Sequence, residues 1–289
     1  NSELKYMNLQ IIKYLKQNYI LSPWEIPKWQ YNILYFLASI INFLLFHIKK
    51  KEDIFIFSSY RSGSTWLAEI IYKFPKVKYV QEPLSPYKKN IEKHLFPIVP
   101  SNTYTNNDLS NNDNILINYI TALSKGKYVT SRRYNFFSPS FNFYTNRSVF
   151  KILRGNALIE KILKNFPEDY YIFLVRHPIS CAMSKLNSRI TKDFTKTIDK
   201  YFNDNVYVEK YLSNKIIKYI TNNIESFSEL EKEIIIWCLG NKPLIKNYKI
   251  LNSRTKRIIL LTYEELLLYT NDVLLDLSVR MNLEKVDFT

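Results

Sequence analysis

The loop SSYRSGSTW, residues 58–66, combines hydroxyl side chains, one arginine and one glycine, which are residue types that bind phosphate. An apolar run at residues 54–57 precedes it and an amphipathic pattern follows, so we expect a strand, a tight turn and a helix. A helix N-terminus leaves backbone N–H groups unpaired and carries a partial positive charge, and together these bind phosphate. The loop therefore predicts a phosphate site, although an ordinary strand-to-helix turn with a serine cap would have the same pattern.

Each polar residue of the loop has a predicted part in that site. Gly63 allows the tight turn or a close backbone approach, and Arg61 supplies a permanent cation with a planar set of donors. Further donors are expected from Ser62, Ser64 and Thr65. The loop lacks the first glycine and the lysine of G-x-x-x-x-G-K-[ST], so it lacks the parts that hold a magnesium triphosphate.

A second motif, FLVRHPISCAMSKLNSR, contains an arginine just past a predicted strand. Arg176 and Ser184, two turns into the following helix, could converge on one phosphate. The two motifs, in this order, resemble the sulfotransferases that use 3′-phosphoadenosine-5′-phosphosulfate (PAPS), in which they hold the 5′-phosphosulfate and the 3′-phosphate. The segment LLTYEELL is similar to a third, less specific motif of the family. The resemblance covers roughly residues 54–84, 149–190 and 258–268.

The resemblance implies a fold, a reaction and a cofactor. The fold is α/β, a three-layer αβα, P-loop-like arrangement with a central, mostly parallel sheet. The reaction is in-line transfer of a sulfuryl group from PAPS to a hydroxyl, with PAP as product and no metal ion. Arg61 is then catalytic, because a cation beside the leaving phosphate oxygen lowers the barrier. The implied cofactor-binding residues are Arg61, Ser62, Gly63, Ser64, Thr65, Trp66, Arg176 and Ser184.

The acceptor is less well defined than the cofactor. The form of the first motif with arginine is similar to that of the carbohydrate, tyrosylprotein and related bacterial branches of the family. We therefore expect the acceptor to be a carbohydrate or glycoconjugate. The alternative is a tyrosine side chain or a small-molecule alcohol or amine. Two other classes remain: a P-loop kinase, which the missing Gly–Lys disfavours, and a non-enzymatic nucleic-acid-binding protein. The basic residues are dispersed, so we expect no nucleic-acid partner.

The acceptor hydroxyl needs a general base, and Glu82 is the first candidate. It follows a predicted strand in KYVQEPLSP, where related branches carry a glutamate, although a surface or capping role would give the same pattern. His94 is the second candidate, because cytosolic members of the family use a histidine. His177 is expected to be structural, since the residue beside the phosphate-binding arginine varies in the family.

Other basic and aromatic residues could line the site. Arg154 ends a predicted strand where related carbohydrate enzymes carry a basic residue near the cofactor or the substrate. Arg132 and Arg133 either meet an acidic substrate or form a solvated basic pair. Trp66 and Trp237 could flank the adenine or the acceptor, with packing in the core as the default.

Alternating strands and helices must position these residues, and they indicate a mostly parallel α/β sheet with helices on both faces. Continuous apolar runs such as YYIFLV indicate buried strands, and KYVTSRRY at residues 127–134 is a further strand candidate. We divide the chain into a helical segment over residues 1–50 and a sulfotransferase domain over residues 51–289. An Asn-rich loop is expected around residues 100–114.

The chain of 289 residues carries 41 Lys and Arg against 26 Asp and Glu, a net charge of +15. Such a surplus favours an anionic partner, although an AT-rich genome would also enrich lysine. Two cysteines, Cys181 and Cys238, offer neither a disulfide framework nor a metal spacing. We therefore expect no metal site.

Residues 31–48 are apolar for nearly the length of a membrane span. Their apolar positions recur at helical one-face spacing, so we expect a helix packed on the domain, with peripheral membrane contact as the alternative. Free thiols mildly favour a reducing compartment, and we expect a cytoplasmic protein. The alternative is the Golgi lumen, if a signal anchor has been removed.

Overall fold

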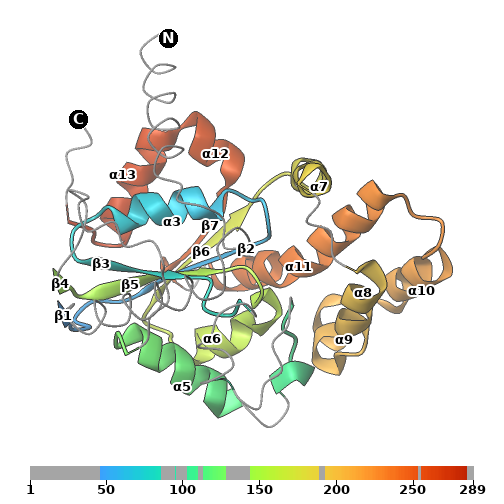
Figure 1. Ribbon diagram of the computed structural model, residues 1–289, viewed down its shortest axis with the longest axis horizontal. Coiled ribbons are helices and arrows are strands. Elements are labelled where there is room, and N and C mark those ends of the chain that lie inside the picture. The colour runs from blue at the N-terminus through green and yellow to red at the C-terminus, as the bar shows by residue number, and fades with distance from the viewer. Residues whose placement is uncertain are drawn as a thin grey trace, which may run out of the picture. The chain divides into compact units, whose positions relative to one another are not determined.

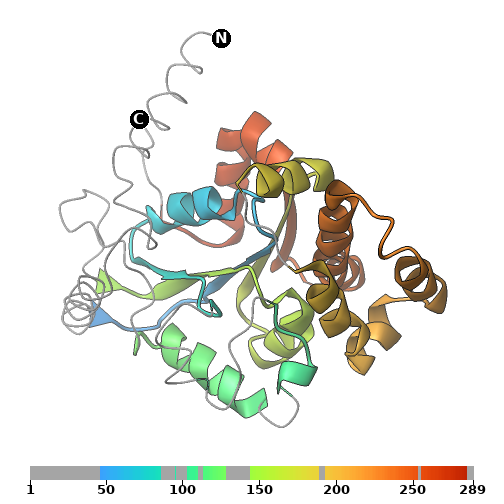
Figure 2. The ribbon, with the colours of Figure 1, turned by 45° about the vertical axis from the view of Figure 1, so that its right-hand side comes forward.

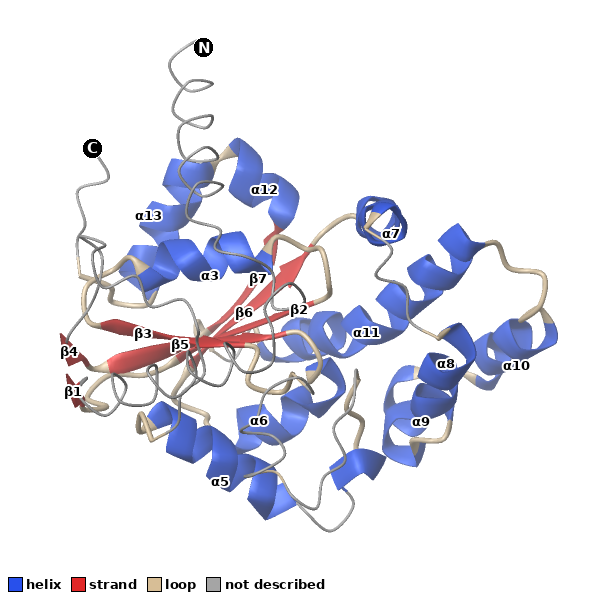
Figure 3. Ribbon diagram, viewed as in Figure 1, coloured by secondary structure: helices blue, strands red, loops and turns tan. Residues whose placement is uncertain are grey.

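The computed structural model describes residues 46–85, 95, 103–109, 113–127, 144–188, 193–252 and 255–284 (Figure 1). All of them belong to one compact unit, residues 45–289. Within this unit a layer of strands lies between two layers of helices, as the colours of Figure 3 show. The predicted three-layer αβα, P-loop-like fold is therefore confirmed.

Five parallel strands form the central sheet, in the order β3-β5-β2-β6-β7. They are β2 (Ile54–Ser58), β3 (Val77–Gln81), β5 (Arg147–Ile152), β6 (Tyr170–Val175) and β7 (Ile258–Thr262). Their sequences are mostly apolar because a parallel sheet between two helical layers is buried on both faces. The carboxyl ends of parallel strands meet at one edge, so the loops that follow β2, β3, β5 and β6 gather there.

Alternate residues of each strand enter two separate cores, because successive side chains point to opposite faces of a sheet. Ile54 and Ile56 pack with helices on one face, whereas Phe55 and Phe57 pack with helices on the other. The first face is covered by α3 (Ser64–Tyr72), α12 (Tyr263–Leu268) and α13 (Thr270–Arg280). The second is covered by α5 (Asp113–Ser124), α6 (Ile159–Asn165) and α11 (Glu229–Leu251), as Figure 2 also shows.

Four further helices lie to the right of the sheet in Figure 1. They are α7 (Pro178–Asn187), α8 (Phe194–Phe202), α9 (Asn205–Tyr211) and α10 (Asn214–Asn222). The side chains of Asp193, Asp204 and Ser213 cap the N-termini of α8, α9 and α10 by accepting backbone N–H bonds. Tyr207 and Tyr211 pack in a small core that α8, α9, α10 and α11 share.

The prediction that residues 1–50 are helical is wrong at the C-terminal end of that segment. Phe46–His47 form strand β1, which pairs in parallel with β4 (Tyr144–Thr145). The imidazole of His47 is hydrogen-bonded to the Thr145 hydroxyl and to the Ser124 carbonyl, each at 2.7 Å. These long-range contacts override the local helical periodicity.

The Asn-rich loop predicted around residues 100–114 is also shorter than expected. It contains the 3-10 helix η1 (Asn107–Leu109), and α5 already begins at Asp113, whose negative charge suits a helix N-terminus. Most of the strand candidate at residues 127–134 and most of residues 31–48 lie outside the described residues. Of the helices that the structure describes, none is long and apolar enough to cross a membrane.

Candidate active site

A five-residue loop, Ser59 to Gly63, joins the central strand β2 to helix α3; we call it the glycine loop. Gly63 has φ +86°, in the left-handed region that favours glycine. A Cβ at Gly63 would also lie 2.3 Å from a ring carbon of Tyr263. Both backbone conformation and space therefore require glycine here. Tyr263 belongs to the third motif, LLTYEELL, so this motif packs directly against the glycine loop.

Arg61 connects the glycine loop to the second motif. Its backbone adopts φ +66°, an uncommon conformation for a residue other than glycine and one that clusters at functional sites. Arg61 Nε donates to Ser184 Oγ at 2.9 Å, and Arg176 Nη1 donates to the Arg61 carbonyl oxygen at 3.0 Å. Three residues that the two motifs contributed thus lie together, although Ser184 is 123 positions from Arg61.

An open groove runs past these residues along α7. It is lined by Arg61, Arg176, Ser180, Met183, Ser184, Asn187 and Ser188. The Arg176 guanidinium carbon lies 4.6 Å from the ring centroid of Tyr263, and Arg176 Nε is buried without a hydrogen-bond partner. Among the described residues, no ion pair joins either guanidinium to a carboxylate. Two uncompensated guanidiniums beside hydroxyl groups can bind phosphate.

The other polar residues of the first motif are not equally accessible. Ser62 is fully buried and its hydroxyl donates to the Ser59 carbonyl oxygen at 2.7 Å, so a phosphate could receive only its backbone N–H. Ser64, the first residue of α3, is also buried. The Trp66 ring lies edge-on to Tyr263, with 6.3 Å between centroids, and packs against the core. The donors of this motif are therefore chiefly backbone groups.

Glu82, directly after β3, lies in a cluster with two cations. Its Oε1 accepts from Lys151 Nζ at 2.9 Å and its Oε2 accepts from Arg154 Nη1 at 2.6 Å. Lys151 Nζ also donates to Thr65 Oγ1 at 2.7 Å, so the cluster reaches the first turn of α3. Burial alone would raise the pKa of Glu82, but the charges and hydrogen bonds of Lys151 and Arg154 lower it to about 2.

Lys151 is a site residue that sequence reasoning missed. Its side chain is 3% exposed, although it belongs to the apolar run VFKIL of β5. A lysine is rarely buried unless it is paired, so a lysine within a buried strand is a signal for a charged site at that strand. Arg154, which the sequence did single out, lies three residues further along and completes the cluster.

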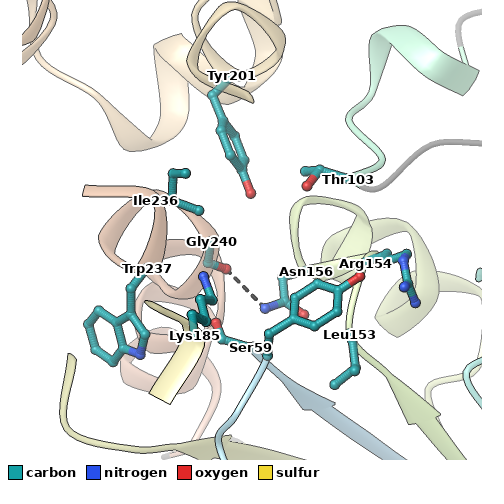
Figure 4. A pocket seen from close by; sticks show the side chains of 11 residues that line it. Ser59, Thr103, Leu153, Arg154, Asn156, Lys185, Tyr201, Ile236, Trp237 and Gly240 are labelled. Atoms are coloured by element: carbon teal, nitrogen blue, oxygen red, sulfur yellow. Dashed lines mark hydrogen bonds between the residues drawn. The ribbon is translucent and has the colours of Figure 1, made fainter. Parts of the chain in front are cut away.

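A second, smaller pocket lies beside this cluster (Figure 4). Polar and aromatic residues of its lining include Ser59, Thr103, Arg154, Asn156, Tyr201 and Trp237. In Figure 4 the Tyr201 hydroxyl points from α8 toward the pocket. Asn156 Nδ2 donates to the Gly240 carbonyl oxygen at 3.1 Å, whereas Asn156 Oδ1 is buried without a partner. A buried acceptor without a partner is uncommon, and it calls for a donor from a ligand or a water molecule at this pocket.

Four candidates from the sequence remain: His94, Arg132, Arg133 and His177. His94, Arg132 and Arg133 lie outside the described residues. The backbone N–H of His177 donates to Glu264 Oε1 at 3.2 Å, which ties the start of α7 to α12. Within the part of the chain that the structure describes, no group of three or more His, Cys, Asp or Glu side chains could hold a metal ion.

The fold is α/β, and the glycine loop at the end of its central strand presents donors suited to an anion. A family model described as the sulfotransferase family matches residues 53–214, more than half of the chain. The chain therefore belongs to the sulfotransferase family. The matched residues include the glycine loop, Glu82, Lys151 and the groove along α7.

Several solved structures align with most of this chain, but with low sequence identity and low structural similarity. The sulfotransferase domain from the curacin biosynthetic pathway is 18% identical, with 83% of this chain and 76% of that chain covered and a TM-score of 0.47. For the sulfotransferase domain of the Synechococcus PCC 7002 olefin synthase the identity is 16%, the coverage 83% and 76%, and the TM-score 0.44. Mouse sulfotransferase SULT7A1 complexed with PAP is 14% identical, with 88% and 64% covered and a TM-score of 0.39. None of the curated protein sequences matches this chain.

Proposed function

We propose that this enzyme transfers a sulfuryl group from PAPS to a hydroxyl group of a carbohydrate or glycoconjugate. The observation that carries the proposal is the convergence of Arg61, Arg176 and Ser184 on one groove beside the N-terminus of α3. PAPS carries a 5′-phosphosulfate and a 3′-phosphate, so its binding site needs two neighbouring groups of anion donors. The glycine loop is one such group, and the residues around the start of α7 are the other.

Three observations support the fit of a doubly phosphorylated nucleotide. Arg176 Nε is buried without a partner, and a buried donor without a partner is costly unless a ligand satisfies it. Neither Arg61 nor Arg176 is neutralised by a carboxylate of the described residues. The left-handed φ of Gly63 makes the tight turn that places Arg61 beside the N-terminus of α3. We assign the 5′ end to Arg61 and the N–H groups of residues 62–65, and the 3′-phosphate to Arg176 and Ser184.

Two cations of the chain stabilise the charge that develops during the reaction. Bound PAPS supplies the activated sulfuryl group and the PAP leaving group. Arg61 holds a permanent positive charge at the glycine loop, where it stabilises negative charge on a departing phosphate oxygen. Lys151 adds a second positive charge at Thr65 from inside the sheet. Because its side chain is 3% exposed, water screens this charge little.

We propose Glu82 as the general base, with His94 as the alternative. A carboxylate with a pKa of about 2 is a weak base, and the low value results from Lys151 and Arg154. Lys151 contacts both Glu82 and Thr65, so it can share its charge with a phosphate held at the first turn of α3. Glu82 then receives a smaller share, its pKa rises, and it accepts a proton from the acceptor hydroxyl more readily.

The pocket beside Glu82 supports a hydroxyl-rich acceptor. Arg154 belongs to the Glu82 cluster and also lines the pocket, so the acceptor would lie next to the proposed base. Hydroxyl and amide groups that can bond a sugar come from Ser59, Thr103, Asn156 and Tyr201. Aromatic side chains in the same lining offer apolar faces for a sugar ring. A tyrosine side chain or a small alcohol or amine is the alternative acceptor.

The test is an acceptor screen with purified protein and PAPS over sugars, phenols and small alcohols, followed by PAP formation. We expect PAP to form only when an acceptor is present. Family membership favours this reaction over a P-loop kinase and over a nucleic-acid-binding protein. Binding of ATP with magnesium but not of PAP would support the kinase. Nucleic-acid binding that weakens steeply with salt, without PAP binding, would support the third class.

A further inference from the structure

A buried ion pair joins α7 to α11. Lys185 Nζ on α7 donates to Glu233 Oε2 on α11 at 2.7 Å, and each of the two side chains is 4% exposed. The two helices pack against each other, and Figure 1 shows α11 running below α7. Lys185 also lines the acceptor pocket, but the reaction as proposed above gives neither residue a catalytic role, so the presence of two charges in this contact needs an explanation.

Lys185 directly follows Ser184, so the two side chains leave α7 about 100° apart. Ser184 lines the open groove and accepts the hydrogen bond of Arg61, whereas Lys185 lines the acceptor pocket and reaches α11. Helix α7 is thus a wall that the two cavities share. Its position relative to α11 determines where Ser184 meets the glycine loop.

Stability alone does not require an ion pair in this contact. Apolar side chains of similar volume stabilise a buried helix contact equally well or better, because two charges must lose their hydration. An ion pair differs from an apolar contact in its specificity. A shift of α7 along α11 would leave two buried charges unpaired, so the 2.7 Å contact selects one register of the two helices.

We propose that Lys185 and Glu233 form a positioning pair for the 3′-phosphate. The pair holds α7 in the register in which Ser184 and Arg176 both meet Arg61, and it thereby sets the preference for nucleotides that carry a 3′-phosphate. The inference rests on the proposed function, in which this end of the groove receives that phosphate. Lys185 and Glu233 act through Ser184 and do not themselves bind the nucleotide.

The test compares PAP with adenosine 5′-monophosphate, which lacks the 3′-phosphate, by titration calorimetry. No acceptor is present, because Lys185 also lines the acceptor pocket. The variant Lys185→Met/Glu233→Leu removes both charges and keeps apolar bulk in the contact. We expect its preference for PAP over the monophosphate to fall about ten-fold, the size of one weakened charge-assisted hydrogen bond. Affinity for the monophosphate should change little.

A matched control removes a partly exposed ion pair from the same helix. Lys232 and Glu229 on α11 are also 2.7 Å apart, and Lys232→Met/Glu229→Met should keep the wild-type preference. A folded Lys185→Met/Glu233→Leu variant with the wild-type preference overturns the inference. If that variant does not fold, Glu233→Gln gives the same comparison: a reduced preference supports the inference and an unchanged one overturns it. A wild-type protein that binds PAP no better than the monophosphate contradicts the proposed function instead.

Discussion

Replacement of Glu82 by glutamine removes the carboxylate that Lys151 and Arg154 share and leaves both cations buried without it. The pKa of Glu82 is about 2, against an ordinary value of 4.5. This displacement corresponds to about 3 kcal/mol of net stabilisation, after the cost of burying the carboxylate is subtracted from the gain of the ion pairs. We expect Glu82→Gln to lower the free energy of unfolding at pH 7 by that amount. The midpoint of thermal unfolding should fall by roughly 6–12 °C.

The effect of Glu82→Gln on stability should depend on pH in a defined direction. Because the pKa of Glu82 is lower in the folded state than in the unfolded state, its stabilisation is complete above pH 4.5 and is lost as the pH falls towards 2. The difference in unfolding free energy between wild type and variant should shrink over that interval. As a control, Asp276→Asn removes an exposed ion pair with Arg280 and should cost less than about 1 kcal/mol.

The same variant separates binding from chemistry. Without the Glu82 carboxylate, the positive charges of Lys151 and Arg154 attract a bound phosphate more strongly, so Glu82→Gln should bind PAP at least as tightly as wild type by titration calorimetry. Turnover should fall by about 10²–10⁴-fold because the proposed base is gone. Wild-type turnover in Glu82→Gln would refute the assignment of the base. Unchanged stability at pH 7 would refute the energetic role of the cluster.

Four further variants test other parts of the structure. Gly63→Ala places a Cβ 2.3 Å from the Tyr263 ring at φ +86°, so chemical unfolding should show a loss of about 1–3 kcal/mol together with weaker PAP binding. Gly240→Ala, whose Cβ would meet nothing closer than 3.6 Å, should not lower stability. Lys151→Met should lower single-turnover rates by about 10²-fold if its charge stabilises the leaving oxygen, and unaltered rates would exclude that role. Burial and the charge of Lys78 lower the pKa of His47 to about 4. The free energy of unfolding of wild type should therefore decrease as the pH falls from 6.5 to 4, because the folded state resists protonation of His47. In His47→Gln this decrease should be missing from the pH dependence of unfolding.

The convergence of the two motifs on one site was predicted, but the direct hydrogen bond between Arg61 and Ser184 was not. Both motifs consist of a strand, a loop and a helix, and the loops of neighbouring parallel strands lie at the same edge of a sheet. Strands β2 and β6 are neighbours, which brings the two loops together. The family resemblance added the expectation that the two loops hold one doubly phosphorylated ligand.

The cluster around Glu82 could not be predicted in the same way. Strand β5 lies between β3, which precedes Glu82, and β2, which precedes the glycine loop. Only this strand order lets Lys151 reach both Glu82 and Thr65, and strand order is not contained in local periodicity. Strand β1 is a similar case, because its partner β4 is 98 residues away.

The contact of Tyr263 with the glycine loop was also hidden from sequence reasoning. The third motif matched the family pattern, but the pattern does not say that its tyrosine packs against Gly63 and beneath Arg176. The motif thus contributes a ring that lies against both the glycine loop and Arg176. A glycine with a positive φ and a ring at van der Waals distance are tertiary facts that appear only once the chain is folded.

The central claim is that Arg61 and Arg176 hold the two phosphates of one nucleotide. Titration calorimetry of PAP against wild type, Arg61→Ala and Arg176→Ala tests it most directly, with adenosine 5′-monophosphate as the reference ligand. We predict that wild type prefers PAP, that Arg176→Ala loses that preference by about 10–100-fold, and that Arg61→Ala weakens both nucleotides. Equal affinity of wild type for the two nucleotides, or an Arg176→Ala variant with full preference for PAP, would contradict the account.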